Sequence, residues 1–474
     1  MEYRDKKVKD IVITYIGGGS RGWAWSLMTD LANEPRLSGV VKLYDIDFHA
    51  AQNNEKIGNL YSSMEGAQGK WTYQAIPKLE EALQDSDFVI ISILPGTFRE
   101  MWSDVHAPEQ YGIFQSVGDT AGPGGMIRAL RTIPMFVTIA EAIKSISPKA
   151  WVINYTNPMS LCVKTLYHTF PEIKAFGCCH EVFTTQALLA TMCSKAFDIE
   201  KIQRDEIHVN VLGINHFTWF NEASYQGYDL FPIWKDFVMQ HYEEGFEENH
   251  KNWANSTFDS AHRVKFDLYK RFGYIAAAGD RHLAEFMPSC DYLKDPDTVR
   301  SWKFGLTTVQ WRIEDMKRRF ERSAKLIQGE EKPNLTQSGE EGVLLIKALL
   351  GMERVISNVN MPNRGQIANL PMDAVVETNA VFSRDSIKPV IVGSIPENIL
   401  ELTLPHVINH DLILKAAIDC RIDFVEQAFS KDPLVKGRGC SIKEVKSLVK
   451  TMIRNTLQYL QEEWNQEDGI IKMR

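Results

Sequence analysis

The sequence predicts an α/β fold in which a parallel sheet, covered by helices on both faces, is joined to a second, α+β part. Residues 11–16 form a nearly continuous apolar run, which is typical of a strand buried in a parallel sheet. Strand-like and helix-like segments then alternate, as they do in α/β domains. Beyond about residue 205 the alternation loosens, which predicts one domain over 1–205 and a second over 206–474.

The individual elements follow from apolar patterning and from the turn residues that bound each run. We expect strands at 11–16, 40–45, 88–94, 150–154 and 208–213, and helices at 26–34 and 50–59. After the last of these strands we expect aromatic-rich helical stretches through residue 330, and a largely helical remainder from Ile399. Polar residues just past the strand ends are the expected ligand contacts, because open α/β sheets bind ligands there.

A glycine-rich turn follows the first strand. Residues 17–22 read Gly-Gly-Gly-Ser-Arg-Gly and contain G-x-G-x-x-G in frame, a motif that lets the backbone approach a pyrophosphate at a helix N-terminus. An acid at the end of the second strand accepts the ribose hydroxyls and repels a 2′-phosphate. The order strand, glycines, helix, acid predicts a Rossmann-type, doubly wound domain that binds NAD through Gly17, Gly18, Gly19, Ser20, Gly22 and Asp45, with Asp47 as the alternative acid.

Charge and cysteine content restrict the functional classes. The formal net charge of −8 argues against nucleic-acid binding, which needs a basic face. Seven cysteines without framework spacing predict reduced thiols. No secretory segment precedes the first strand, and the most apolar run, residues 88–94, is too short to span a membrane. We therefore expect a cytoplasmic protein that binds neither nucleic acid nor membrane.

Two residues far apart in the chain are candidate metal ligands. Cys179 follows an apolar approach and so is expected at another strand end, and His216 lies in the segment Gly-Ile-Asn-His. A thiolate with one imidazole leaves coordination positions open, as catalytic metal sites do. Each residue alone is also compatible with a buried core position, so the residues themselves leave the metal site open.

Several sequence blocks together resemble glycoside hydrolase family 4. The blocks are 17–22, 118–125 (Gly-Asp-Thr-Ala-Gly-Pro-Gly-Gly), 128–134 (Arg-Ala-Leu-Arg-Thr-Ile-Pro), 154–158 (Asn-Tyr-Thr-Asn-Pro) and 363–377. The resemblance implies a glycosidase that depends on NAD and Mn²⁺, with a fold related to lactate and malate dehydrogenases. Residues 179–182, Cys-His-Glu-Val, are most similar to the α-galacturonidase subgroup, with α-glucuronidase and α-galactosidase as alternatives.

The resemblance also implies roles for particular residues. Cys179 and His216 would bind Mn²⁺, and the substrate would contact Asn157, Asp119 and His282. His180 belongs to the Cys-His variant and is a further catalytic candidate. The catalytic base varies within the family: Asp280 is the first choice here because it follows Gly279, and Tyr274 and His282 remain alternatives. An arginine should bind a uronate carboxylate, and the sequence does not rank the candidates Arg263, Arg281 and Arg364.

The implied mechanism oxidises the sugar at C3 with NAD, which makes the C2 proton acidic. A base removes that proton, the aglycone leaves by elimination, water adds, and the sugar is re-reduced, so that NAD is regenerated in each turnover. Two rival readings stay open: an NAD-dependent 2-hydroxy-acid dehydrogenase, which would release NADH, and a non-catalytic NAD- or sugar-binding regulator. The family forms homodimers or homotetramers, and the substrate is expected to be a small uronide or oligosaccharide.

Overall fold

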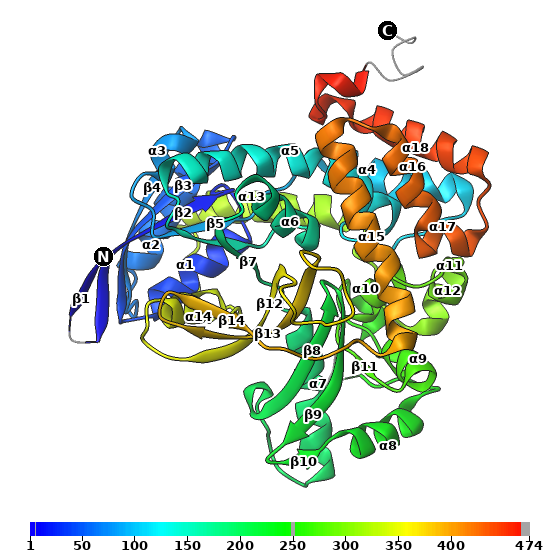
Figure 1. The fold of residues 1–474 in the computed structure, drawn as a ribbon. Helices are drawn as coiled ribbons and strands as arrows, with labels where there is room; N and C mark the ends of the chain where they lie inside the picture. Colours follow the sequence, from blue (N-terminus) through cyan, green and yellow to red (C-terminus); the bar gives the residue numbers. More distant parts are fainter. Residues whose placement is uncertain (5, 248–251, 466–474) are drawn as a thin grey trace.

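Six parallel strands form the centre of the larger sheet in the computed structural model, which describes residues 1–4, 6–247 and 252–465 (Figure 1). Their order across the sheet is β7-β6-β5-β2-β3-β4, so the strand order reverses between β2 and β5. This doubly wound order confirms the predicted fold class. The strands are β2 (Lys7–Ile16), β3 (Leu37–Tyr44), β4 (Lys70–Ala75), β5 (Phe88–Ile91), β6 (Trp151–Asn154) and β7 (Lys174–Gly177).

Helices cover both faces of this sheet. In β5, Phe88 and Ile90 pack with the apolar side chains of α1, α2 and α14, whereas Val89 and Ile91 pack with those of α3, α5 and α6. Strands buried on both faces read as apolar runs, which is why the sequence located β2, β3, β5 and β6. Strand β4, in which exposed and buried residues alternate, was not among the expected strands. The helices are α1 (Trp23–Asn33), α2 (Phe48–Ser63), α3 (Leu79–Leu83), α5 (Gly122–Ile146), α6 (Met159–Thr169) and α14 (Gly342–Leu349).

Strands from the second half of the chain extend the same sheet. Strand β12 (Val355–Pro362) pairs antiparallel with β7 at Asn360 and Gly177, and β13 (Val375–Ser383) and β14 (Ser386–Pro389) follow outward. Outside this strand order, β1 (Glu2–Arg4) pairs antiparallel with the start of β2, while β4 forms the opposite edge of the sheet. The strands β12 and β13 therefore lie beside the end of β7, which Cys179 follows. The boundary at residue 205 stays a prediction.

A second, antiparallel sheet corrects one expectation. Strand β8 (Ile207–Ile214) was expected, but β9 (Phe217–Tyr225) replaces the helix predicted after it, and β10 (Tyr228–Asp229) and β11 (Ile275–Ala276) pair with β9. The reason lies in the burial of β9. Trp219 packs into one core and Phe220 into another, so the strand has aromatic residues on both faces and lacks the alternation that identifies a half-buried strand.

The remaining helices surround the second sheet and one end of the first (Figure 1). They are α4 (Phe98–His106), α7 (Glu181–Ala196), α8 (Phe231–His241), α9 (Arg263–Phe272), α10 (Asp280–Glu285), α11 (Ser289–Tyr292), α12 (Pro296–Trp302), α13 (Val309–Gln328), α15 (Glu397–Asp419), α16 (Ile422–Lys431), α17 (Pro433–Arg438) and α18 (Ile442–Thr456). In the described ranges, none of the helices has the length and apolarity that crossing a bilayer requires.

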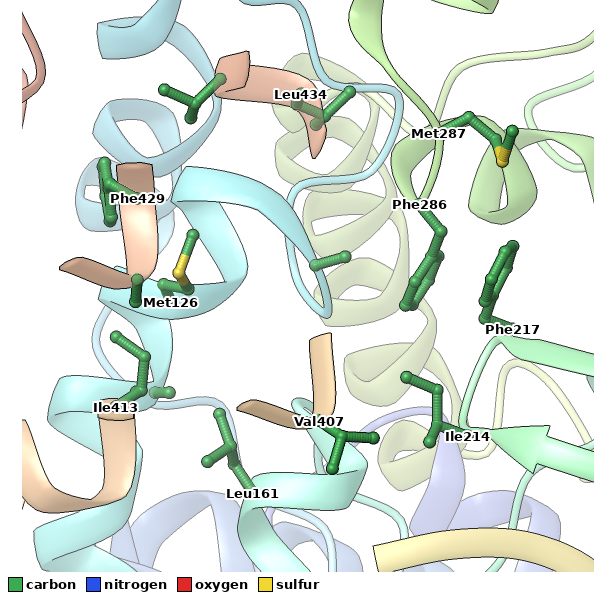
Figure 2. Close-up of a cluster of buried hydrophobic side chains, with 14 of the residues drawn as sticks. Met126, Leu161, Ile214, Phe217, Phe286, Met287, Val407, Ile413, Phe429 and Leu434 are labelled. Atoms are coloured by element: carbon green, nitrogen blue, oxygen red, sulfur yellow. The ribbon is translucent and has the colours of Figure 1, made fainter. Parts of the chain in front are cut away.

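The largest hydrophobic core joins the two sheets to the C-terminal helices. Figure 2 shows Leu161 of α6 and Ile214 of β8 next to Val407 of α15, and Phe217 of β9 beside Phe286; Met126 of α5 belongs to the same core. Phe217 stacks on Phe286, with ring centroids 4.9 Å apart. This core holds the start of α5, the β8–β9 turn and α10 together, and these segments carry or adjoin Asp119, His216 and His282.

Candidate active site

The glycine turn after β2 is held tightly against its neighbours. Gly17 has φ +92°, and a Cβ there would lie 2.0 Å from the carbonyl oxygen of Ser92. The N–H groups of Gly17 and Gly18 both donate to the carbonyl of Tyr44, at 2.9 and 2.8 Å. Only glycine fits this position and this φ, so the turn has the geometry that the motif predicted.

Asp45 lies directly behind the turn. Its Oδ2 accepts the N–H of Gly19 at 2.9 Å, and a Cβ on Gly19 would lie only 2.6 Å from the Cβ of Ala50. Helix α1 begins after Gly22 without a side-chain cap or an acid in its first turn. Its first N–H groups are therefore available to an anion, and the residues fit the pyrophosphate of a dinucleotide.

Asn54 is a residue of this site that the sequence did not single out. Its Nδ2 donates to the carbonyls of Gly18 and Ser20, at 2.7 and 2.8 Å, and its Oδ1 accepts the indole N–H of Trp25. It thus holds the glycine turn from helix α2. A fully buried asparagine in a helix was the available signal, but its burial depends on tertiary packing.

Replacing Asp45 should change nucleotide binding. We expect Asp45→Asn to weaken NAD binding by roughly tenfold and to narrow the preference for NAD over NADP, because a charged acceptor for the ribose is lost. Asp47→Asn is the matched control: Asp47 caps α2 through the N–H of Ala50, and asparagine caps equally well. Fluorescence titration with both nucleotides tests this, and a larger effect at Asp47 would contradict it.

His216 occupies the two-residue turn between β8 and β9 with φ +64°, a conformation that non-glycine residues rarely adopt. Thr120 donates its hydroxyl proton to Oδ1 of Asp119 at 2.9 Å and lies 3.0 Å from Nδ1 of His216. The hydroxyl therefore accepts from Nδ1–H, which leaves Nε2 as the free ring nitrogen. Burial lowers the pKa of His216 to about 3, so the imidazole is neutral, as a metal ligand must be.

Asp119 anchors that chain of hydrogen bonds. Its Oδ2 is 3.1 Å from an Nη of Arg312 on α13. Burial opposes ionisation, but Arg312 and Arg128 hold the pKa of Asp119 well below its ordinary value. The carboxylate is charged and fixes the orientation of His216 through Thr120. The sequence located Asp119 but not Thr120 or Arg312.

Cys179 follows β7, as predicted, and is contacted by Asn215, the residue directly before His216. The Asn215 side chain hydrogen-bonds the Cys179 thiol and also donates to Glu377, 3.2 Å away, while Asn358 donates to the Cys179 carbonyl. Burial, with Glu377 second, raises the pKa of the thiol well above its ordinary range. A thiolate therefore forms here only when a cation replaces the proton.

Glu377 belongs to a sequence block that resembles the family, but the sequence analysis did not assign it to the site. It is buried in β13, accepts from Asn358 and Asn215, and burial raises the pKa of its carboxyl to about 7. The signal was an acid directly after two valines in the motif Val-Val-Glu, because an isolated acid in a buried strand requires partners.

Glu181, the third residue of the Cys-His-Glu-Val motif, joins the start of α10 to this cluster. Its Oε1 lies 2.7 Å from Arg281 and 3.4 Å from Nε2 of His282, and its Oε2 accepts the N–H of Gly279. The His282 ring faces that of His216, with centroids 4.0 Å apart. The structure therefore brings His282 together with the metal-ligand candidate His216.

The other candidate catalytic residues make contacts away from the His216–His282 ring pair. Asp280 is buried and accepts the N–H groups of Val264 and Lys265 at the start of α9, and burial raises its pKa to about 6. Tyr274 is partly buried and packs against the largest hydrophobic core. His180 faces Glu340 at 3.3 Å and the ring of Trp23, the first residue of α1.

Several residues of the candidate site carry a buried polar atom without a hydrogen-bond partner in the described chain, as do residues elsewhere in the fold. Those of the site are Arg128 Nη1, Asn157 Oδ1, Asn215 Oδ1, Arg281 Nε, His282 Nδ1 and Arg312 Nε. Buried polar groups are normally paired, so these atoms suit a ligand rich in hydroxyl groups. The described residues do not place three His, Cys, Asp or Glu side chains together as a metal-binding group. Cys179 and His216, one thiol and one imidazole, would leave coordination positions on a metal open.

Comparison with known proteins agrees with this geometry. Residues 12–195 match the family model described as family 4 glycosyl hydrolase, and residues 211–435 match that of its C-terminal domain. An α-galacturonidase from Lachnoclostridium phytofermentans is 62% identical over 466 residues, which cover 98% of this chain and 100% of that protein.

Two solved structures are similar over nearly the whole chain. The crystal structure of lplD from Bacillus subtilis has a TM-score of 0.89 at 49% identity and covers 94% of this chain and 100% of its own. A 6-phospho-α-glucosidase from gut microorganisms, in complex with NAD and Mn²⁺, has a TM-score of 0.78 at 21% identity, with 96% and 99% covered. The second likeness shows the shared fold.

Proposed function

Because the chain belongs to glycosyl hydrolase family 4, we propose that it is an α-galacturonidase that works with NAD and Mn²⁺. The observation that supports galacturonides as the substrate is the 62% identity to an α-galacturonidase over 98% of the chain. The fold shared with a complex of NAD and Mn²⁺ supports the two cofactors. We further propose that the protein is cytoplasmic and acts as a homodimer or homotetramer.

The residues divide into two groups according to what they hold. The turn after β2 and the N-terminus of α1 would bind the pyrophosphate of NAD, and Asp45 its ribose. Cys179 and His216 would bind the metal, with Asp119 and Thr120 fixing the imidazole. When bound, NAD accepts and returns a hydride, and Mn²⁺ acts as a Lewis acid on substrate oxygens. Residues 1–205 would thus supply the NAD site and residues 206–474 much of the substrate site.

The chain's own side chains would position the sugar and move its protons. Asn157 presents a buried Oδ1 without a partner, which suits a sugar hydroxyl. Nε2 of His282 lies 3.4 Å from Glu181 and 3.2 Å from an Nη of Arg281, and its buried Nδ1 has no partner in the described chain. In the tautomer whose Nε2–H is directed to Glu181, Nδ1 accepts a proton, and the ring lies against that of His216. We assign proton removal from C2 of the sugar to His282, ahead of Asp280, whose oxygens already accept the backbone of α9.

The identity of the base has a direct test. We expect His282→Gln to slow exchange of the C2 proton with deuterated water by a factor of roughly 10² or more, as measured by NMR. Tyr274→Phe should exchange normally, and Asp280→Asn should exchange while losing stability at α9. Loss of exchange in a folded Asp280→Asn, with exchange retained in His282→Gln, would return the role to Asp280.

The function itself is tested on a panel of p-nitrophenyl α-glycosides and short oligogalacturonides. Assays contain NAD, Mn²⁺ and a reducing thiol, with each omitted in turn, while NADH absorbance is followed. We expect galacturonide hydrolysis that needs both cofactors, without net NADH. If galactosides or glucuronides are cleaved in preference, they replace galacturonides as the assigned substrate. Steady NADH formation without cleavage would indicate a dehydrogenase.

A further inference from the structure

Arg128, near the start of α5, is a buried arginine with few partners. Its Nε donates to the carbonyl of Asn157 at 3.0 Å, and its Nη1 is buried without a partner. In the described chain it has no ion pair within 4.0 Å. Burial lowers the pKa of Arg128 to about 10, although the charge of Asp119 acts in the opposite direction.

Arg131, one turn further along the same helix, shows how a buried arginine is usually accommodated. Its guanidinium binds both carboxylate oxygens of Asp104 and donates as well to the carbonyl of Pro95 and the hydroxyl of Thr456. Buried charges are normally paired in this way. Arg128 therefore differs from its neighbour by lacking an anion, while its environment is equally dry.

The nearest acid does not fill that role. Asp119 attracts Arg128, but its two oxygens already accept from Arg312, at 3.1 Å, and Thr120, at 2.9 Å. Beside Arg128, the buried Oδ1 of Asn157 also lacks a partner. A free guanidinium edge next to a free amide oxygen matches a ligand with one carboxylate and neighbouring hydroxyls.

The arginines suggested by the sequence are committed elsewhere. Arg263 donates to the carbonyls of Tyr242 and Ser301, and Arg364 is exposed and paired with Asp373. Arg281 is held between Glu181 and the carbonyl of Phe258. None of these three guanidiniums has a free terminal edge facing the candidate site.

We propose that Arg128 binds the carboxylate of the uronic acid through its terminal nitrogens and is the residue that distinguishes a uronide from the corresponding neutral glycoside. The inference rests on the proposed function and deepens it by naming the group that recognises the substrate. Two parallel N–H···O bonds to a carboxylate in a dry site give both affinity and orientation, and a CH₂OH group at the same position gains neither.

The test compares D-galacturonate with D-galactose by calorimetry on the protein with NAD, and galacturonide with galactoside hydrolysis in the holoenzyme. Wild type should bind galacturonate roughly 10²-fold more tightly, and Arg128→Met should remove that difference. Arg128→Lys should retain part of it, because lysine keeps the charge but not the fork. Arg364→Gln should behave like wild type, and loss of discrimination there would overturn the proposal.

Stability separates binding from a structural role. Without ligand, the melting temperature of Arg128→Met should be unchanged or higher, since a buried charge that lacks an ion pair in the described chain is removed; a clear loss of stability would instead mean that Arg128 is structural. If Arg128→Met keeps the preference for galacturonate, the inference fails while the α-galacturonidase assignment stands. If wild type binds galacturonate through Arg128 but hydrolyses no galacturonide, the proposed function fails and the inference stands.

Discussion

Cys179→Ser is expected to reduce metal-dependent glycoside hydrolysis by roughly 10³-fold or more, because a Lewis acid contributes several kcal/mol to the reaction. A serine hydroxyl at the end of β7 keeps the size of the thiol and its hydrogen bond to Asn215. It does not supply a thiolate, so one of the two protein ligands is lost. NAD binding should persist, since the glycine turn and Asp45 belong to β2 and β3.

The neighbouring cysteine provides the control. Cys178 is also partly buried, and its side chain hydrogen-bonds Tyr155, a contact that serine can keep. Cys178→Ser should therefore retain both Mn²⁺ binding, followed by electron paramagnetic resonance, and turnover. Normal Mn²⁺ affinity in Cys179→Ser, or equal losses in both variants, would contradict the ligand assignment.

Local motifs explain which parts of the site the sequence located. The glycine turn, Asp45 and Cys179 each come just after a strand whose last residues are mostly apolar, so the apolar runs place them at the correct edge of the sheet. The same reasoning gave a parallel sheet with both faces covered. These features depend on residues within one strand–turn–helix unit.

The missing parts depend on contacts between distant segments. Glu377 and Asn358 reach Cys179 only because β12 and β13 join the sheet at β7, a pairing that no local pattern encodes. Thr120 orients His216 because the core in Figure 2 brings the start of α5 against the β8–β9 turn. Asp280 was chosen for its neighbour Gly279, but the docking of α9 against it is a tertiary event.

The buried ion pair of Arg131 and Asp104 should have the largest effect on stability. Both side chains are essentially inaccessible, at 0% and 1% exposure. The pair connects α4 to α5, and Arg131 also binds Thr456 at the end of α18. Arg131→Met should lower the free energy of unfolding by about 3–5 kcal/mol, because it leaves the Asp104 carboxylate buried without a counter-ion.

Denaturant unfolding of the single and double variants separates the charge from the packing. Asp104→Leu should be similarly destabilising, since it leaves the Arg131 guanidinium unpaired, whereas Asp104→Leu with Arg131→Met should recover much of the loss. Additive losses in the double variant would mean that the shape of the two side chains, and their links to Pro95 and Thr456, stabilise the fold more than their charges do. Recovery of stability in the double variant would instead show that these charges can be buried because they are paired. Arg128 has no such ion pair in the described chain.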